Sequence, residues 1–159
     1  RFRGMKTMLP KDEVQTLKQV SLFAGVPPAK LKLLAFTSDR MSYSAGEVLF
    51  RQGDLGDAAY VILSGKADIL VDSPNGQIKI TELETNSIVG EIAILCDVSR
   101  TATVMASSPM EVLRIGKDHF LKLLVDFPEI TIEIMRVLAD RLSHTTSELT
   151  EARSRERQH

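Results

Sequence analysis

The sequence predicts one mainly β domain with helices before and after it. Between Met41 and Ile115, apolar residues recur in short runs with a period of two, and turn residues separate the runs. On both sides of this region the apolar period is helical. The chain has 159 residues, of which 43% are hydrophobic, so it can bury one core without metals or disulfides. Strands this short and evenly spaced favour a sandwich or barrel over parallel βαβ units.

Two helices are expected before the strands. The first carries apolar residues at helical spacing, namely Val14, Leu17, Val20 and Phe23. Gly25 ends this helix, and the pair Pro27-Pro28 begins a second one whose apolar face includes Leu31 and Leu34.

Six runs predict strands: Val48–Phe50, Tyr60–Leu63, Ala67–Val71, Ile78–Ile80, Thr101–Met105 and Val112–Ile115. Gly46, Gly53, Gly56 and Gly65 are interpreted as turn glycines. One segment interrupts the strands, because residues 90–95 lack both alternation and turn chemistry. A short helical turn opened by its glycine is the natural interpretation.

Two helices are expected after the strands. Phe120 lies in the first, and Pro128 starts a long last helix. Along this helix, residues recur at intervals of four and three: Thr131, Met135, Leu138, Leu142, Thr145, Leu149 and Ala152. This seam is equally compatible with a helix that lies on its own β domain and with a two-chain coiled coil, which would make the protein a homodimer.

Composition disfavours several classes of protein. Lys+Arg number 20 and Asp+Glu 21, so the chain lacks the basic excess that duplex binding favours, and we expect no direct nucleic acid binding. No run approaches the roughly 20 apolar residues of a membrane span. The single cysteine, Cys96, excludes an intramolecular disulfide and four-cysteine metal sites. We therefore expect a cytoplasmic protein.

The segment from Val89 to Val104 combines three features that favour anion binding. Gly90 allows the backbone to approach a ligand, the short helix that follows offers free N–H groups, and the Arg100 guanidinium can bind phosphate oxygens in a fork. Glu91 would repel phosphate, but its carboxylate is a natural acceptor for a sugar hydroxyl. A phosphate beside a sugar predicts a nucleotide ligand.

The same residues carry a family resemblance. The sequence G-E-I-A-I at residues 90–94, followed after a variable loop by R-T-A-T at residues 100–103, resembles the phosphate-binding cassette of the cyclic nucleotide-binding domain family. The resemblance runs from about Leu22 to Leu149 and includes the pattern at residues 52–57. It implies an antiparallel β-roll, similar to a double-stranded β-helix or jelly roll, with N-terminal helices, a short cassette helix and a long C-terminal helix. It also implies a regulatory module that senses cAMP or cGMP and transmits binding through its C-terminal helices.

The resemblance implies nine ligand-binding residues, which are Gly90, Glu91, Ile92, Ala93, Ser99, Arg100, Thr101, Thr145 and Thr146. Arg100 is expected on the phosphate, Glu91 on the ribose 2′-hydroxyl, and backbone N–H groups near Ala93 on the phosphate. The Thr101 hydroxyl can meet the amino group of guanine, whereas Thr145 and Thr146 can reach the amino group of adenine. We expect both nucleotides to bind, with cAMP as the physiological ligand.

Two residues depart from the family pattern. Ser99 stands where the family often has proline, and Asn86 stands where it often has glycine. A serine hydroxyl either adds a phosphate contact or adds nothing, and asparagine adopts positive φ more readily than most residues. Neither change disrupts the predicted cradle.

The predicted organisation has five parts: a tail at 1–9, a helical segment at 10–38, the β-roll at 39–115 with its cassette at 89–104, hinge and lid helices at 116–155, and a tail at 156–159. The first residue is not methionine, which suggests a tag remnant, a trimmed end or an excerpt. The alternatives are therefore a sensor fragment of a transcription regulator or channel, or a domain whose empty pocket serves protein interaction.

An enzyme on a similar β-roll is the competing class. A metal-dependent enzyme of this shape needs imidazoles that converge from the strands. The three histidines, His119, His144 and His159, all follow the last predicted strand. We therefore expect neither catalysis nor a metal site.

Overall fold

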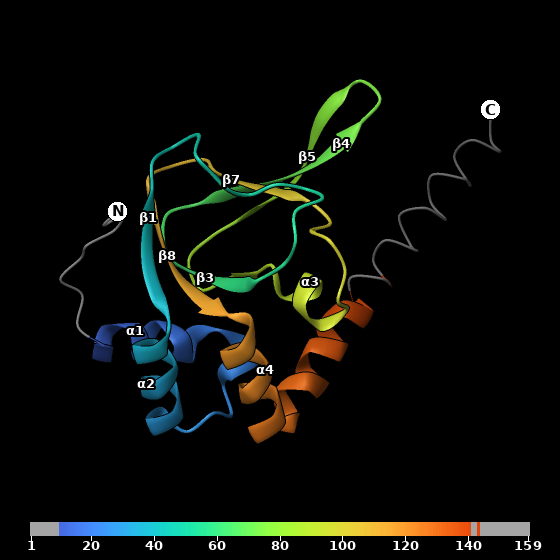
Figure 1. Ribbon diagram of the computed structural model, residues 1–159. Helices are drawn as coiled ribbons and strands as arrows, with labels where there is room; N and C mark the ends of the chain where they lie inside the picture. Colours follow the sequence, from blue (N-terminus) through green and yellow to red (C-terminus); the bar gives the residue numbers. More distant parts are fainter. Residues whose placement is uncertain (1–9, 141–142, 144–159) are drawn as a thin grey trace.

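The computed structural model describes residues 10–140 and 143, and two four-stranded sheets form the centre of this region (Figure 1). The strands are β1 Asp39–Tyr43, β2 Val48–Phe50, β3 Ala58–Ser64, β4 Ala67–Ser73, β5 Gly76–Leu83, β6 Ile88–Val89, β7 Thr103–Ala106 and β8 Met110–Gly116. One sheet has the order β1-β8-β3-β6 and the other β2-β7-β4-β5, with antiparallel pairing throughout. The predicted antiparallel β-roll with flanking helices is confirmed.

The helices are α1 Pro10–Gln19, the 3-10 helix η1 Ser21–Phe23, α2 Pro28–Thr37, α3 Glu91–Leu95 and α4 Lys117–Asp126, and residues 128–140 are also helical. Figure 1 shows α1, α2, α4 and the helix of residues 128–140 gathered on one side of the β-roll, with α3 at its flank. The first helix does not continue to Phe23 as the apolar spacing predicted. Extended backbone at Val20 separates α1 from η1, and η1 buries Leu22 and Phe23.

Strand β3 shows why the roll has two cores. Ala59, Val61 and Leu63 pack with the helices, whereas Ala58, Tyr60 and Ile62 pack inside the roll between the sheets. Because successive strand residues point to opposite faces, a strand that is covered on both sides is continuously apolar. This arrangement brings the backbone of Ala58 and the ring of Tyr60 to the interior face.

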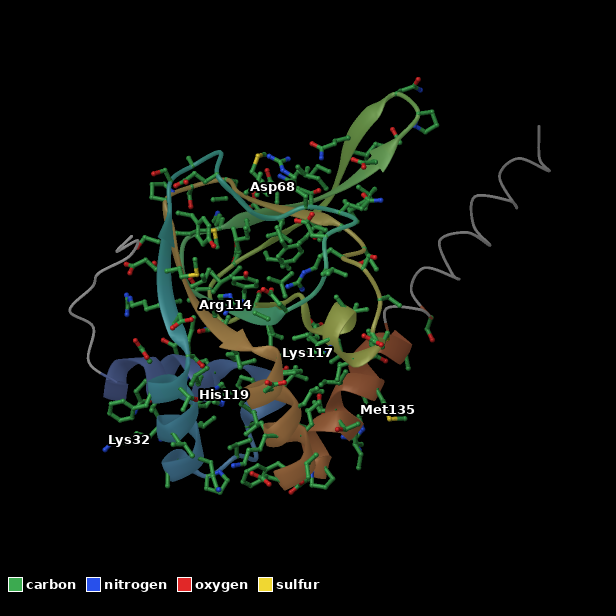
Figure 2. All side chains as sticks on the ribbon, in the orientation of Figure 1. Lys32, Asp68, Arg114, Lys117, His119 and Met135 are labelled. Atoms are coloured by element: carbon green, nitrogen blue, oxygen red, sulfur yellow. The ribbon has the colours of Figure 1, made fainter. Side chains whose placement is uncertain are left out.

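The helix of residues 128–140 buries a face that shares only Leu138 with the described part of the predicted seam. Ile130 and Ile134 are buried in the helix-side core, whereas Thr131 and Met135 of the seam are exposed. Figure 2 shows Met135 on the outer side of this helix. The described part of the helix therefore lies on its own domain. Leu142, Thr145, Leu149 and Ala152 lie outside the described residues, so the homodimer remains a prediction.

Gly56 has a different role from the predicted turn glycine. Gly46, Gly53 and Gly65 have positive φ, but Gly56 does not. A Cβ atom on Gly56 would overlap the Cβ of Ala93 in α3. The missing side chain therefore lets the β2–β3 loop pack directly against α3, which holds one wall of the cavity described below.

Candidate functional site

A cavity of about 420 Å³ lies between the predicted cassette and the interior of the roll. Its apolar wall contains Phe50, Ile69, Ile80, Leu83, Ile88 and Val104. Six of the nine predicted site residues also line it, namely Gly90, Glu91, Ile92, Ala93, Arg100 and Thr101. A largely apolar cavity of this size with a few converging polar groups is typical of a small-molecule site.

Gly90 shapes the entrance to α3. It is the residue before the helix and has the left-handed conformation, with φ of 88°. A Cβ atom here would lie 2.5 Å from Nη1 of Arg100 and 3.3 Å from Cε2 of Phe50. Glycine therefore satisfies both the backbone conformation and the close approach of the arginine. The first N–H groups of α3 have no acceptor within the helix, which makes them available to a ligand.

Arg100 is the central cation of the site. Its residue is only 3% exposed. Nη1 donates a hydrogen bond to the carbonyl oxygen of Gly90 at 2.7 Å, and Nη2 donates to that of Ala58 at 2.7 Å. Within the described residues, Nε has no hydrogen-bond partner. Burial lowers the pKa of Arg100 by penalising its charged form.

A buried cation with an unmatched donor is costly to maintain, because its hydration has been lost and not fully replaced. An anion in the adjoining cavity would supply both the missing acceptor and the countercharge. The geometry of Arg100 therefore favours an anionic ligand.

The turn between β2 and β3 fixes the backbone of this arginine. The N–H of Arg100 donates to the carbonyl oxygen of Asp54 at 2.7 Å, and the N–H of Gly53 donates to that of Arg100 at 2.9 Å. The motif at residues 52–57 thus serves the site indirectly, by holding the loop that carries the guanidinium.

Asp57 connects the site to the start of α4. Its carboxylate lies 3.7 Å from Nη2 of Arg100 and 2.9 Å from Nη2 of Arg114, which Figure 2 labels on β8. Burial opposes the charge of Arg114, but its hydrogen bond with Tyr60 and the charge of Asp57 outweigh this and raise its pKa. The carbonyl oxygen of Asp57 also accepts a hydrogen bond from the N–H of Lys117 at 2.9 Å. A shift at Arg100 can thus reach the β8–α4 junction.

Glu91 lines the cavity and is 5% exposed. A second cavity of about 220 Å³, lined in part by Leu22 and Ile134, also reaches Glu91. Glu91 therefore lies between the larger cavity and the helix-side core.

The other predicted site residues lie elsewhere. Thr101 is exposed at the edge of the larger cavity, whereas Ser99 is exposed and is not part of its lining. Thr145 and Thr146 lie outside the described residues. Asn86 has φ of 75°, in agreement with its expected conformational freedom.

Sequence reasoning missed three contributors. The strand run at residues 48–50 contained Phe50, but nothing in that run pointed to a contact with Arg100. The carbonyl acceptor of Ala58 has no sequence signal at all. Ile80 lines the cavity beside a register shift in the β4–β5 pair, which opposes Ile69 to Thr81 and Leu70 to Lys79. Such a bulge redirects a side chain in a way that strict alternation does not predict.

The family model for the cyclic nucleotide-binding domain matches residues 40–127, a range that contains the whole cassette and the cavity lining. The chain belongs to this family. The predicted membership of the cyclic nucleotide-binding domain family is thereby confirmed. In the described residues, no group of three metal-binding side chains comes together, and no helix there has the length and apolarity to cross a membrane.

Individual relatives agree with this assignment. The domain is 28% identical over 141 residues to a CRP-like cAMP-activated global transcriptional regulator of Mycobacterium tuberculosis, with 88% of this chain and 62% of that protein covered. It is 32% identical over 108 residues to the cAMP-dependent protein kinase regulatory subunit of Aspergillus niger, with 68% and 26% covered. The chain thus spans less than two thirds of either relative.

A solved structure has the same fold over most of the chain. The sensor domain of the transcriptional regulator DNR from Pseudomonas aeruginosa superposes with a TM-score of 0.76 at 25% identity, and the match covers 87% of this chain and 94% of that one. The shared fold thus extends beyond the residues that the family model matches.

Proposed function

We propose that this cyclic nucleotide-binding domain binds cAMP in the 420 Å³ cavity and that binding regulates the protein to which the domain belongs. The observation that carries the proposal is the buried Arg100, whose Nε has no partner within the described residues and whose side chain lines that cavity. The ligands of this family contain a phosphate, and the guanidinium of an arginine binds phosphate oxygens through two parallel N–H donors. We therefore propose that the anion is a phosphate.

In this proposal, different residues contact the phosphate, the ribose and the base of the ligand. The cyclic phosphate accepts hydrogen bonds from Arg100 and from the first N–H groups of α3. The Glu91 carboxylate accepts one from the ribose 2′-hydroxyl. The base lies against the apolar wall that includes Ile80 and Leu83. The residue roles proposed for Gly90, Ile92 and Ala93 follow from the backbone they contribute to the phosphate contact.

The preference for cAMP draws on two sources. The mycobacterial regulator and the fungal kinase subunit are named as cAMP-activated and cAMP-dependent proteins. The hydroxyls of Thr145 and Thr146 are proposed to reach adenine from the last helix, whereas Thr101 offers one hydroxyl to guanine. One such bond contributes about 0.5–1.5 kcal/mol, so cGMP is also expected to bind.

The regulatory role includes the C-terminal helices. Asp57 contacts both Arg100 and the first amide of α4, so a ligand that moves the arginine also acts on the hinge. A ligand shifts a conformational equilibrium by its difference in affinity for the two states. We propose that the domain is a cytoplasmic sensor without catalysis of its own. It would belong to a larger transcription regulator, channel or kinase-associated protein. We also propose that it forms a homodimer through the last helix.

Calorimetric titration of cAMP into the wild type and the Arg100→Ala variant tests the proposal. Losing a charge-assisted fork is expected to weaken binding about 30- to 1000-fold, or about 2–4 kcal/mol. Lys32 is an exposed residue of α2 that lies away from the cavity (Figure 2). The Lys32→Ala variant should therefore bind cAMP as the wild type does. Arg100→Lys keeps the charge and serves if the alanine variant fails to fold.

Two results would contradict the proposal. A correctly folded wild type that binds neither cAMP nor cGMP would leave the domain with an empty pocket and favour a role in protein interaction. Wild-type affinity in a folded Arg100→Ala protein would remove this arginine from the phosphate site.

A further inference from the structure

Two aromatic rings lie beneath the guanidinium carbon of Arg100. The guanidinium carbon lies over the Phe50 ring, 4.0 Å from its centroid, and 6.0 Å from the centroid of Tyr60. The two rings are themselves in contact, with centroids 5.7 Å apart and planes inclined by 36°. Phe50 comes from β2 in one sheet and Tyr60 from β3 in the other. The closure of the roll therefore creates the aromatic pair.

The ring contact and the hydrogen bonds use different parts of the guanidinium. The carbonyl oxygens of Gly90 and Ala58 accept from Nη1 and Nη2, which donate in the guanidinium plane. The Phe50 contact places the guanidinium carbon over the ring face, and it consumes no donor. Phosphate oxygens bind a guanidinium at its edge, so the ring does not compete with a phosphate for Nε.

The ring also adds to the electrostatic stabilisation of Arg100, because the one ion pair that Arg100 makes within the described residues is long and exposed. Asp57 is the acidic side chain paired with Arg100, but its oxygen is 3.7 Å away and its side chain is 70% exposed, so solvent weakens the attraction. Arg100 itself is almost fully buried. The negative face of an aromatic ring stabilises a desolvated cation at this distance.

We propose that Phe50 is the positioning residue for the phosphate-binding arginine: its ring holds the guanidinium of Arg100 in the one orientation that leaves Nε for the ligand. This inference rests on the proposed function, because it assumes that a phosphate is the partner of Arg100. Phe50 also packs in the interior core and lines the cavity. Its test must therefore separate positioning from packing and from direct ligand contact.

Phe50→Leu and Phe50→Tyr form the matched pair of variants. Leucine keeps an apolar side chain but has no π face, whereas tyrosine keeps the face. We expect Phe50→Leu to weaken cAMP binding about 3- to 30-fold in calorimetry, the range of a partly desolvated cation–π contact, and Phe50→Tyr to bind within about twofold of the wild type. Thermal unfolding without ligand shows which variants are folded, and only the affinities of folded variants are compared.

A second readout follows Arg100 itself. In the NMR spectrum of the unliganded protein, the Nε–H of Arg100 should exchange slowly with water in the wild type and in Phe50→Tyr, and quickly in Phe50→Leu. This measurement needs no ligand, so it still tests the positioning role if the wild type binds no cyclic nucleotide, which would refute only the proposed function.

Three outcomes overturn the inference. Equal cAMP affinity in the wild type and Phe50→Leu would mean that the ring is dispensable. Equal losses in Phe50→Leu and Phe50→Tyr would assign the effect to packing. A loss of affinity in Phe50→Leu with unchanged exchange at Nε of Arg100 would assign it to direct contact between the ring and the ligand.

Discussion

Replacing Gly90 by alanine should separate backbone strain from damage to the site. Gly90 has φ of 88°, a conformation that costs a residue with a Cβ atom about 1–2 kcal/mol. The new Cβ would lie 2.5 Å from Nη1 of Arg100, so the guanidinium must move. A displaced arginine loses a charge-assisted hydrogen bond to the phosphate, which is worth about 1.5–3 kcal/mol, or roughly 10- to 100-fold in affinity.

Gly46→Ala is the matched control for this experiment. Gly46 has φ of 89°, almost the same as Gly90, but a Cβ atom there would meet nothing within 4 Å. Urea unfolding should show a loss of about 1–2 kcal/mol in Gly46→Ala from backbone strain alone, and at least that loss in Gly90→Ala, where the guanidinium must also move. Calorimetry should show the loss of cAMP affinity in Gly90→Ala alone.

The reasoning is refuted if folded Gly90→Ala binds cAMP as tightly as Gly46→Ala does. Such a result would mean that the position of Arg100 against the Gly90 carbonyl is irrelevant to the ligand. A loss of affinity in both variants would instead show that a distant change in stability is enough to impair binding.

Three further predictions concern single contacts. Glu91→Gln should weaken cAMP, and 2′-deoxy-cAMP should lose little more in this variant, because both changes remove the same bond; additive losses in calorimetry would assign Glu91 another role. Thr101→Ala should lower the cGMP-to-cAMP affinity ratio about 2- to 10-fold in paired titrations, and an unchanged ratio would contradict the hydroxyl contact. Gly65→Ala should cost about 2–4 kcal/mol in urea unfolding, since its Cβ would overlap Pro109 and Met110 at φ of 90°; a cost no greater than that of Gly46→Ala would contradict this steric account.

Local patterns predicted most of the secondary structure but not how the last helix lies on the domain. The apolar run at residues 60–63 identified β3, and the Pro27-Pro28 pair marked the start of α2. The predicted seam ran through Thr131, Met135 and Leu138, yet of these three only Leu138 packs on the domain, beside the buried Ile130 and Ile134. When apolar residues spread over more than one face of a helix, the sequence does not say which face is buried. The surface on which the helix packs decides that.

The sequence by itself predicted the family of the domain, because the residues that carry the family motif are close together in the chain. Gly90, Glu91 and Arg100 lie within eleven residues, so their spacing is visible without a fold. Tertiary structure alone decided how Arg100 is held. The ring of Phe50 and the carbonyl of Ala58 come from strands of different sheets, and they meet the guanidinium only because the roll closes with this register. Contacts of that kind depend on strand pairing between distant segments, and no local spacing encodes them.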